Sequence, residues 1–374
     1  MRLLARYLMR ECLVALGYCF SAFLLLWVSL DLLSSLHDLQ ENKLRAGDVA
    51  EYYLFRIPEF LPVALPVAIL LALLYALTNH ARHNEITAIR AAGVSLWRLS
   101  LPYFAIGLLA AVALFASNEF LAPKTAEVAE QILIRRVQRQ RSDEERLQVS
   151  NLAFENATAG RFWRIGIYNP RTGEMIRPSV NWRRPDGTRQ QFDAERATYT
   201  NGCWTFYNVS GWKKTATTNS LMEPIKKATL PMPEFAERPE EINSQISVMD
   251  RIAHPTRTHR ADIPIAEIIN YLHFNPNPEA SIRSRLFTKL HGRFAGPFTC
   301  IVVVMMALPF AAASNRRNVF VGVAASLFIF FVYFMLQQVG FAMGEVGRIP
   351  AWLGAWFPNL LFGIAGLWMV ARVR

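Results

Sequence analysis

Residues 319–343 read VFVGVAASLFIFFVYFMLQQVGFAM, a stretch without one charged side chain. A helix of about 20 apolar residues matches the thickness of the hydrocarbon core of a bilayer. Other stretches of the chain have the same character, and together they predict six membrane spans. We place these spans at Leu13–Leu33, Arg56–Leu77, Leu99–Ala122, Phe294–Ala313, Val319–Met343 and Leu353–Val370. The sequence therefore predicts an integral membrane protein made mainly of α-helices.

A long polar block divides the spans three and three. Such a block cannot lie in hydrocarbon, because its backbone groups would lack hydrogen-bond partners there. We therefore expect transmembrane helices 1–3 in residues 1–123, a folded domain in water over residues 124–292, and transmembrane helices 4–6 in residues 293–374. The overall composition, 52% hydrophobic residues with a net charge of +11, is thus an average of two unlike parts.

Motifs of catalysis are missing from the sequence. It has no G-x-x-x-x-G-K-[ST] phosphate loop, no G-x-S-x-G and no H-E-x-x-H, and its seven histidines and four cysteines show no metal-ligand spacing. Only Cys203 lies in the polar block, so no disulfide can form within that block. We expect no catalytic residue, no metal and no cofactor, so the chain is not an enzyme and ATP would be bound and hydrolysed by another protein.

Basic residues in the short loops predict the orientation. Cytoplasmic loops carry an excess of Lys and Arg, whereas long domains cross the membrane largely regardless of charge. One side holds Arg2, Arg6, Arg10, Arg82, Arg90, Arg98, Arg316, Arg317, Arg372 and Arg374. The other side holds Lys43, Arg45 and Arg348, with Arg56 at a boundary. We expect both termini in the cytoplasm and the polar domain outside it.

The polar domain reads as mostly β-structure. Turn residues separate its candidate strands, and the strongest of these signals is the hairpin dipeptide Asn201-Gly202. The candidate strands are Leu147–Phe154, Phe162–Tyr168, Met175–Trp182, Gln190–Tyr199 and Trp204–Trp212. Such a meander predicts a sandwich or an open jelly roll. Around it we expect a helix over Lys124–Arg141, an irregular stretch over Pro231–His259, and a short helix capped by Asp262 that runs to Leu272.

The second loop, NEITAIRAAG at Asn84–Gly93, is the sharpest local signal. Asn84 suits a helix N-cap, Glu85 favours the positive end of the helix, and Gly93 suits the left-handed position after it. A short helix at the cytoplasmic surface follows. It is either a capped connector or a rigid peg that inserts into a partner protein. In the second case Glu85 and Arg90 supply polar contacts, and Ile86 and Ile89 an apolar edge.

Three further patterns bear on the spans. Pro58, Pro62 and Pro66 lie near one face of the second span and predict a bent or loosened helix, for packing or for gating. Gly340 and Gly344 predict close helix packing. Polar residues in or near the spans either lie at the interface or form the polar wall of a substrate cavity. They are Asp31, Glu59, Asn118, Glu119, Gln337, Gln338 and Glu345.

Basic residues also gather at the expected outer level of the spans. They are candidates for holding an anionic head group, although basic residues at span ends commonly reach toward the phosphates of membrane lipids. The candidates are Lys43, Arg45, Arg56, Lys124, Arg293 and Arg348, with Lys289 beside them. We expect lipids, and no nucleic acid, as their partners.

Several motifs resemble those of a known family. They are Ile57-Pro58 through Leu65-Pro66, Asn84-Glu85-Ile86-Thr87-Ala88 running to Ala91-Ala92-Gly93-Val94-Ser95, His291-Gly292-Arg293-Phe294-Ala295 with Pro297-Phe298, and Ala307-Leu308-Pro309. With the three-plus-three layout, the chain resembles the lipopolysaccharide export permeases, which are paired membrane subunits of an ABC transporter that extracts lipopolysaccharide from the bacterial inner membrane. The resemblance covers almost the whole chain. Arg90 departs from the family pattern, which has an apolar or neutral residue there.

The resemblance carries its own expectations. It implies that Glu85 contacts a cytoplasmic ABC ATPase dimer and that a sister permease subunit completes the glycolipid cavity. It implies a lateral opening between the first and fifth spans, and a periplasmic jelly roll that passes lipopolysaccharide to a jelly-roll bridge protein. Aromatic residues would line the roll or form its ordinary core; the candidates are Phe162, Trp163, Tyr199, Trp204, Phe206 and Tyr207.

Two other functions remain open from the residues, and a third, a membrane enzyme, is disfavoured because the sequence shows no clustered catalytic side chains. One is an ABC permease for lipoproteins or another lipid. The second is a membrane-anchored sensor or scaffold whose outer domain binds a ligand. A sensor needs a cytoplasmic output module, for which the short loops and tails of this chain offer little room.

Overall fold

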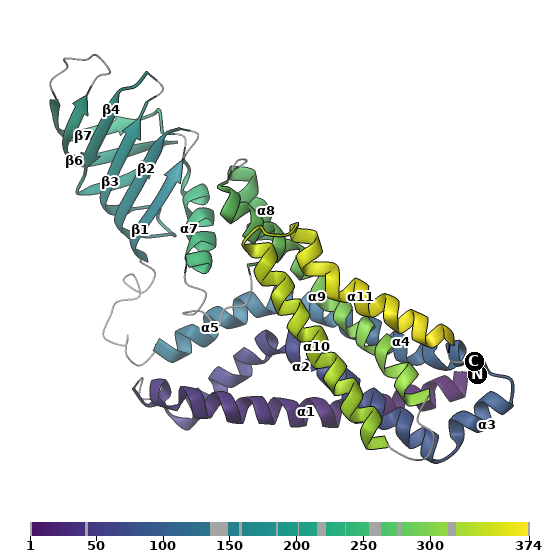
Figure 1. The fold of residues 1–374 in the computed structure, drawn as a ribbon. Helices are drawn as coiled ribbons and strands as arrows, with labels where there is room; N and C mark the ends of the chain where they lie inside the picture. Colours follow the sequence, from purple (N-terminus) through teal and green to yellow (C-terminus); the bar gives the residue numbers. More distant parts are fainter. Residues whose placement is uncertain are drawn as a thin grey trace. The chain divides into compact units, whose positions relative to one another are not determined.

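The computed structural model describes residues 2–41, 44–134, 149–156, 159–184, 186–200, 202–214, 222–235, 237–253, 263–275, 278–312 and 319–372 (Figure 1). These residues form two compact units, a helical unit and a sheet unit. The helical unit holds the helices that precede the sheet and those of the C-terminal part. Helix α8 (Ile265–Phe274) is divided between the units after Ile268.

Six long apolar helices confirm the predicted spans. Apart from α4, each helix is longer than its predicted apolar stretch, because the helix continues beyond that stretch. The helices are α1 (Arg2–Glu41), α2 (Ala46–Arg82), α4 (Leu96–Ala116), α9 (Ala280–Ala312), α10 (Val319–Glu345) and α11 (Ala351–Arg372). The predicted third span continues past α4 through a π-helical turn, η1 (Ser117–Leu121), into α5 (Ala122–Ile134).

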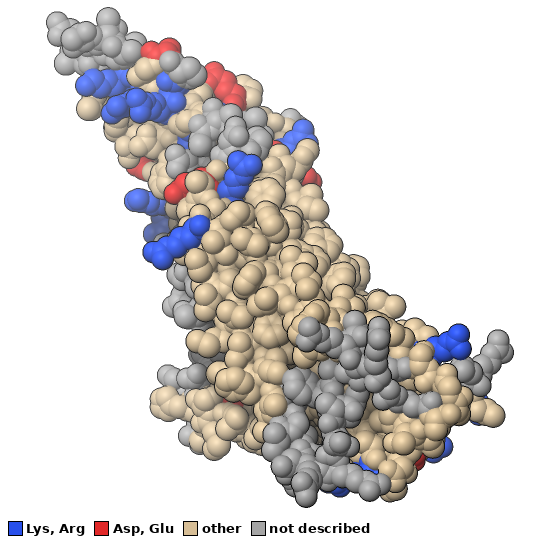
Figure 2. Space-filling model, turned by 45° about the vertical axis from the view of Figure 1, so that its right-hand side comes forward, with Lys and Arg blue, Asp and Glu red and all other residues tan. Residues whose placement is uncertain are grey.

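Helix α9 lies at the centre of the helical unit and packs against α2, α4, α10 and α11. The core between α1, α2, α4 and α9 is apolar, and its largest fully buried side chain is that of Tyr103. Apolar side chains such as Leu25, Leu33 and Phe328 are more than half exposed. Figure 2 shows a broad surface over the helices without charged side chains. Exposed apolar helix faces of this kind are what lipid or a neighbouring membrane subunit covers.

The glycine pair serves close packing, as the sequence predicts. A Cβ atom on Gly340 would lie 2.5 Å from the carbonyl oxygen of Gly354 on α11. A Cβ atom on Gly344 would lie 2.9 Å from Oγ1 of Thr288 on α9. Glycine therefore lets α10 approach both neighbours. Helix α2 stays helical through Pro58, Pro62 and Pro66, and the loosening expected there remains a prediction.

The sheet unit contains one antiparallel sheet. Its strands are β1 (Val149–Asn156), β2 (Arg161–Tyr168), β3 (Met175–Arg183), β4 (Arg189–Asp193), β5 (Arg196–Thr200), β6 (Cys203–Lys214) and β7 (Glu223–Met232). Both β4 and β5 pair with β3 and β6, so together they occupy one strand position. The strands thus follow one another in space as in sequence, which confirms the predicted meander.

The strand predicted over Gln190–Tyr199 is broken at Ala194 and Glu195. Beside the break, Arg177 of β3 (φ 53°) and Asn208 of β6 (φ 52°) have left-handed backbones that a regular strand does not adopt. Side-chain Nδ2 of Asn208 donates to Oε2 of Glu195 at 2.7 Å. A row of irregular residues therefore crosses three strand positions. The described strands form a single sheet, which is closer to an open roll than to a sandwich of two sheets.

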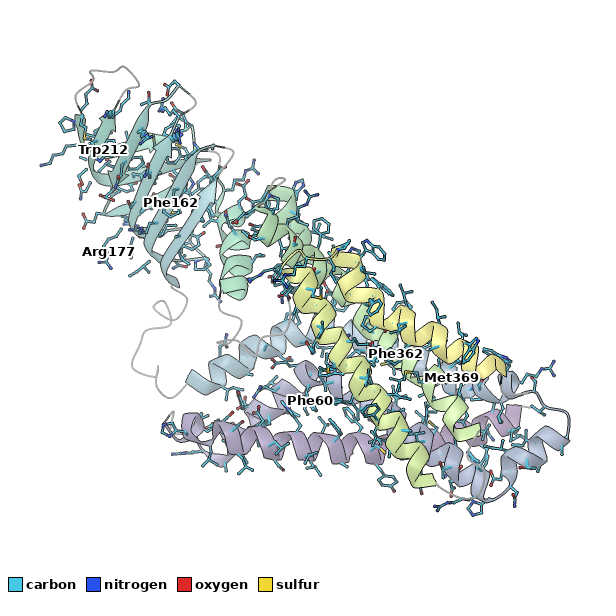
Figure 3. The ribbon with its side chains drawn as sticks, in the orientation of Figure 1. Phe60, Phe162, Arg177, Trp212, Phe362 and Met369 are labelled. Atoms are coloured by element: carbon cyan, nitrogen blue, oxygen red, sulfur yellow. The ribbon has the colours of Figure 1, made fainter. Side chains whose placement is uncertain are left out.

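Aromatic residues fill the inner face of the sheet. Trp163, Trp204 and Phe206 are fully buried. Their neighbours along the strands, Phe162 (labelled in Figure 3) and Tyr207, lie on the other face and are 39% and 37% exposed. Phe235, which follows β7, packs edge-on to Trp163 at 5.2 Å between ring centroids. For Trp163, Trp204 and Phe206 the ordinary core role is therefore the observed one.

The stretch predicted as irregular, Pro231–His259, is largely regular, so that prediction was wrong. It begins with the last two residues of β7 and contains α7 (Pro239–Ala253). Acidic residues in the first turn favour the start of α7, and Ile242 is buried in the core of the sheet unit. Residues 254–259 lie outside the described residues, as do the predicted cap Asp262 and the end of the helix predicted over Lys124–Arg141.

Candidate functional site

Helix α3 (Glu85–Ala91) stands between α2 and α4 where the sequence places a surface helix. Gly93 has φ +84°, the left-handed conformation expected after a helix. Asn84 has φ 58°, so it does not adopt the extended backbone typical of an N-cap, and that detail of the prediction was wrong. Ile86 and Ile89 are half-buried against the core of the helical unit rather than freely exposed. The side chain of Arg90 lies outside the described part of the chain.

Glu85 is held by residues from the first two spans. Its Oε2 lies 2.7 Å from Nδ1 of His80, and the hydroxyl of Tyr7 donates to its Oε1 at 3.4 Å. On the other side of the ring, Nε2 of His80 lies 3.0 Å from Oε2 of Glu11, an ion-pair distance. His80 is 1% exposed, whereas the side chains of Glu11 and Glu85 are 34% and 35% exposed. The carboxylate of Glu85 is therefore held in place by the buried ring of His80 while part of it stays exposed.

A second charged cluster joins α1 and α2 nearer their other ends. Arg56 is 4% exposed, and its Nη1 donates to Asp31 at 2.7 Å and to the hydroxyl of Tyr52 at 3.1 Å. Its Nε lies 3.5 Å from Oε2 of Glu59. The guanidinium also lies over the ring of Trp27, which stacks on Phe60 at 4.3 Å between ring centroids. The guanidinium of Arg56 is thus bound by side chains of its own chain, and little of it is exposed for contact with a head group.

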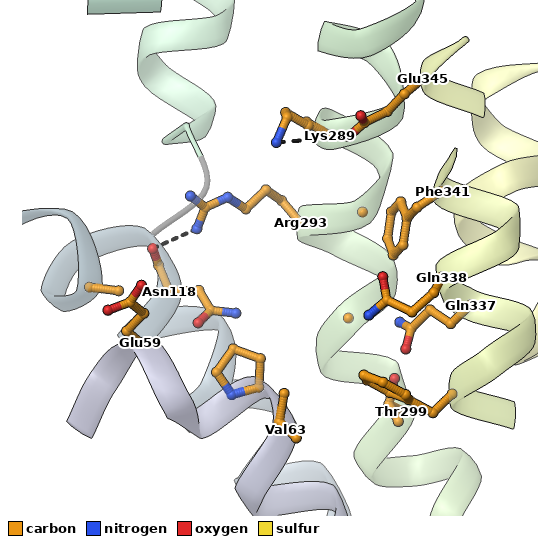
Figure 4. Close-up of a pocket in the computed structure, with 15 residues that line it drawn as sticks. Glu59, Val63, Asn118, Lys289, Arg293, Thr299, Gln337, Gln338, Phe341 and Glu345 are labelled. Carbon is orange, nitrogen blue, oxygen red and sulfur yellow. Dashed lines mark hydrogen bonds and ion pairs between the residues drawn. The ribbon is translucent and has the colours of Figure 1, made fainter. Parts of the chain in front are cut away.

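A polar cavity of about 390 Å³ lies in the helical unit between α2, η1, α9 and α10 (Figure 4). It brings together most of the polar span residues, which favours the cavity interpretation for these over the interfacial one. Its charged and amide lining residues are Glu59, Asn118, Lys289, Arg293, Gln337, Gln338 and Glu345. Two polar span residues have other roles: Asp31 pairs with Arg56, and the carboxylate of Glu119 accepts the backbone N–H of Ile265 at 3.0 Å.

The chain was compared with known proteins. The model of the family Lipopolysaccharide export system permease LptF/LptG matches residues 6–372, essentially the whole chain. The chain belongs to the lipopolysaccharide export permease family. No curated protein matches it. As a lipopolysaccharide export permease with six apolar helices, it is a multi-pass inner-membrane protein of a transport system.

In this permease the predicted basic group is only partly brought together. Arg293 of α9 lines the cavity and is 6% exposed, and its Nη1 donates to the carbonyl oxygen of Asn118 at 2.7 Å. That carbonyl belongs to the π-helical turn, a feature that often marks functional sites in helices. Nearby, Lys289 lies 3.8 Å from Oε1 of Glu345. Arg45, Lys124 and Arg348 are exposed and do not line the cavity, and Lys43 lies outside the described residues.

The permease site combines a polar cavity with a surface helix whose Glu85 is hydrogen-bonded to His80. Within the described residues, no group of three or more His, Cys, Asp or Glu side chains is placed to hold a metal ion. The polar cavity offers donors and acceptors inside an apolar helical unit, which suits the head group of an amphiphile. The sequence alone did not predict that the ring of His80 lies between the carboxylates of Glu85 and Glu11. The only signal for it was a pair of ionisable residues, Glu11 and His80, near the ends of apolar spans.

Proposed function

We propose that this permease is the transmembrane subunit of an ABC transporter that extracts lipopolysaccharide from the inner membrane. It pairs with a sister permease subunit, and α3 inserts into a cytoplasmic ATPase dimer that binds and hydrolyses ATP. The observation that carries the proposal is α3 itself, a short helix between two spans whose Glu85 is anchored from behind by His80 yet about one third exposed. Glu85, Ile86, Ile89, Arg90 and Gly93 form or position the contact.

The orientation follows from the basic loops. Both termini and α3 lie in the cytoplasm, and the sheet unit lies in the periplasm. Cysteines introduced at exposed positions test this, in a chain whose four native cysteines are replaced by alanine. A cell-impermeant maleimide should label Arg171→Cys in intact spheroplasts, and His83→Cys only after lysis. Labelling of His83→Cys alone in intact spheroplasts would contradict the orientation.

The substrate path uses the apolar and polar surfaces of the helical unit. Lifting acyl chains out of the bilayer costs about 0.8 kcal/mol for each CH₂ group that is left in water. The exposed apolar faces of α1 and α10 supply the cover, and a lateral opening lies between the first and fifth spans, α1 and α10. The polar cavity receives the head group, with Lys289 and Arg293 in its wall. Lys43, Arg45, Arg56, Lys124 and Arg348 remain candidates at the outer level.

The sheet unit passes the glycolipid onward to a periplasmic jelly-roll bridge protein. Among the described strands, β1 pairs only with β2, and β7 pairs only with β6. Unpaired strand edges accept a strand from a partner of like fold. The two edges therefore support an end-to-end array of sheets across the periplasm.

Glu85→Ala in the purified complex tests the coupling role. The contact predicts weaker association of the ATPase and a loss of lipopolysaccharide release from proteoliposomes. The control is His83→Ala, a nearby exposed residue outside α3. Full association and transport by Glu85→Ala would refute the proposal. Mass spectrometry of the lipid that copurifies with the complex separates lipopolysaccharide from the alternatives, a lipoprotein or another lipid.

A further inference from the structure

We infer that His80 is a positioning residue that ties α3 to α1, so that movement of Glu85 by the ATPase is passed to the first span. The inference rests on the proposed function, because it takes α3 as the helix that the ATPase moves. It adds a route by which that movement travels within this chain.

The geometry of His80 carries the inference. The imidazole is 1% exposed and lies between two carboxylates from different helices, Glu85 of α3 and Glu11 of α1. A buried polar ring is costly to leave without partners, so the imidazole favours keeping both carboxylates beside it. Its Nδ1 is hydrogen-bonded to Glu85, whereas its contact with Glu11 is an ion-pair distance without hydrogen-bond geometry. Tyr7 adds a second contact, since its hydroxyl reaches Glu85 while its ring packs edge-on against His80 at 5.7 Å between centroids. Four side chains from three helices thus form one small cluster, the Glu11–His80–Glu85 cluster with Tyr7.

The position of α1 gives the link a mechanical consequence. Among the described residues, helix α1 packs mainly on α2 and to a lesser extent on α4. Near its other end, Asp31 is paired with Arg56 of α2. Helices α1 and α2 are therefore joined near both ends by charged clusters, and a displacement that enters at Glu85 acts on the pair as one element. The exposed apolar face of α1 is the face that we assign to the lateral opening.

The test uses the full complex in proteoliposomes and measures lipopolysaccharide released per ATP hydrolysed. His80→Ala removes the link, and Glu11→Gln removes only the negative charge, and with it the ion pair, on the α1 side without touching Glu85. Each variant should assemble with the ATPase and hydrolyse ATP, yet release about tenfold less lipopolysaccharide per ATP, a typical size for coupling between sites. Because both changes break the same link, the double variant should be no worse than either single variant. His83→Ala is the matched control and should behave as the unmodified complex.

The outcomes separate this inference from the proposed function. If His80→Ala fails to assemble, Glu11→Gln decides the question, since its side chain is partly exposed and nearly unchanged in size. Unchanged release per ATP in Glu11→Gln would overturn the inference, and so would additive losses in the double variant. If Glu85→Ala abolishes transport while Glu11→Gln does not alter it, only the inference fails. If Glu85→Ala is also neutral, the proposed function fails as well.

Discussion

Arg56 of α2 donates to Asp31 of α1 at 2.7 Å, and the two side chains are 5% and 13% exposed. The pair lies toward the end of the helix pair opposite to the Glu11–His80 contact, and Tyr53 also donates to Asp31 at 3.0 Å. A buried ion pair with its remaining groups hydrogen-bonded resists separation, because each charge would be left without compensation. The basic residue that sequence reasoning offers to a head group thus serves first to join two spans.

Arg56→Met should lower the free energy of unfolding by about 3 kcal/mol, because it leaves Asp31 buried without its main partner. Asp31→Leu combined with Arg56→Met should recover most of this loss, since an apolar pair in place of a buried ion pair is often tolerated. Unfolding of the purified chain in mixed micelles of increasing denaturing detergent measures both values. Lys124→Met, at an exposed basic position, is the control.

Transport by the same double variant tells the two roles of Arg56 apart. Recovery of transport together with stability would mean that Arg56 serves packing alone. Recovered stability with transport still lost would assign Arg56 to the substrate path, as the sequence alone suggests.

Gly340→Ala should destabilise the helical unit by about 1–3 kcal/mol, the usual cost of overpacking. The reason is that the new Cβ would lie 2.5 Å from the backbone oxygen of Gly354, which no side-chain rotation can relieve. Gly363→Ala on α11 is the matched control, because a Cβ there meets nothing within 4 Å. Thermal unfolding in one detergent compares the two variants, and equal midpoints would contradict the close packing of α10 on α11.

Local signals in the sequence were enough for much of this fold. The spans follow from runs such as residues 319–343, because hydropathy alone decides which helices enter a bilayer. Gly202 and Gly187 mark tight turns and have φ +78° and +82° in the structure, as such turns require. At the turn that contains Gly187, the side chain of Asp186 accepts a hydrogen bond from the backbone N–H of Thr188 at 2.8 Å. This hydrogen bond lowers the pKa of the Asp186 carboxyl group. Gly93 ends α3 for the same local reason.

The features that were missed depend on distant parts of the chain. Strand β7 carries two prolines and mostly exposed side chains, so its pairing with β6 is not visible in its own pattern. The π-helical turn exposes the carbonyl of Asn118 to Arg293, 175 residues away. Helix α7 forms where Ile242 packs on the sheet core. Likewise, the sequence around His80 does not show its contact with Glu11, because Glu11 lies on another helix, α1.

Tyr333→Phe should lower the free energy of unfolding by about 1 kcal/mol, a usual size for a hydrogen bond between membrane helices. The buried hydroxyl donates to Oδ1 of Asn359 on α11 at 2.7 Å and lies 2.7 Å from Oγ1 of Thr299 on α9. Its removal leaves both partners short of one bond while the ring stays in place against Phe362. Tyr75→Phe is the control, because Tyr75 is 67% exposed. An equal effect of the two changes would mean that the hydroxyl of Tyr333 does not join the three helices.

Lys289→Glu should impair lipopolysaccharide release far more than Lys124→Glu does. Both changes reverse one charge, but Lys289 lines the polar cavity beside Glu345, whereas Lys124 is exposed on α5. Three acidic side chains in the wall, Glu59, Glu345 and the new glutamate, would repel an anionic head group. Within the partly enclosed cavity that repulsion is less screened than at the surface. We expect release to fall by about tenfold, or about 1.4 kcal/mol, for Lys289→Glu. Lys289→Gln should lie between the two. Equal release by the Lys289→Glu and Lys124→Glu complexes, with equal amounts of assembled protein, would exclude the cavity from the path of the head group.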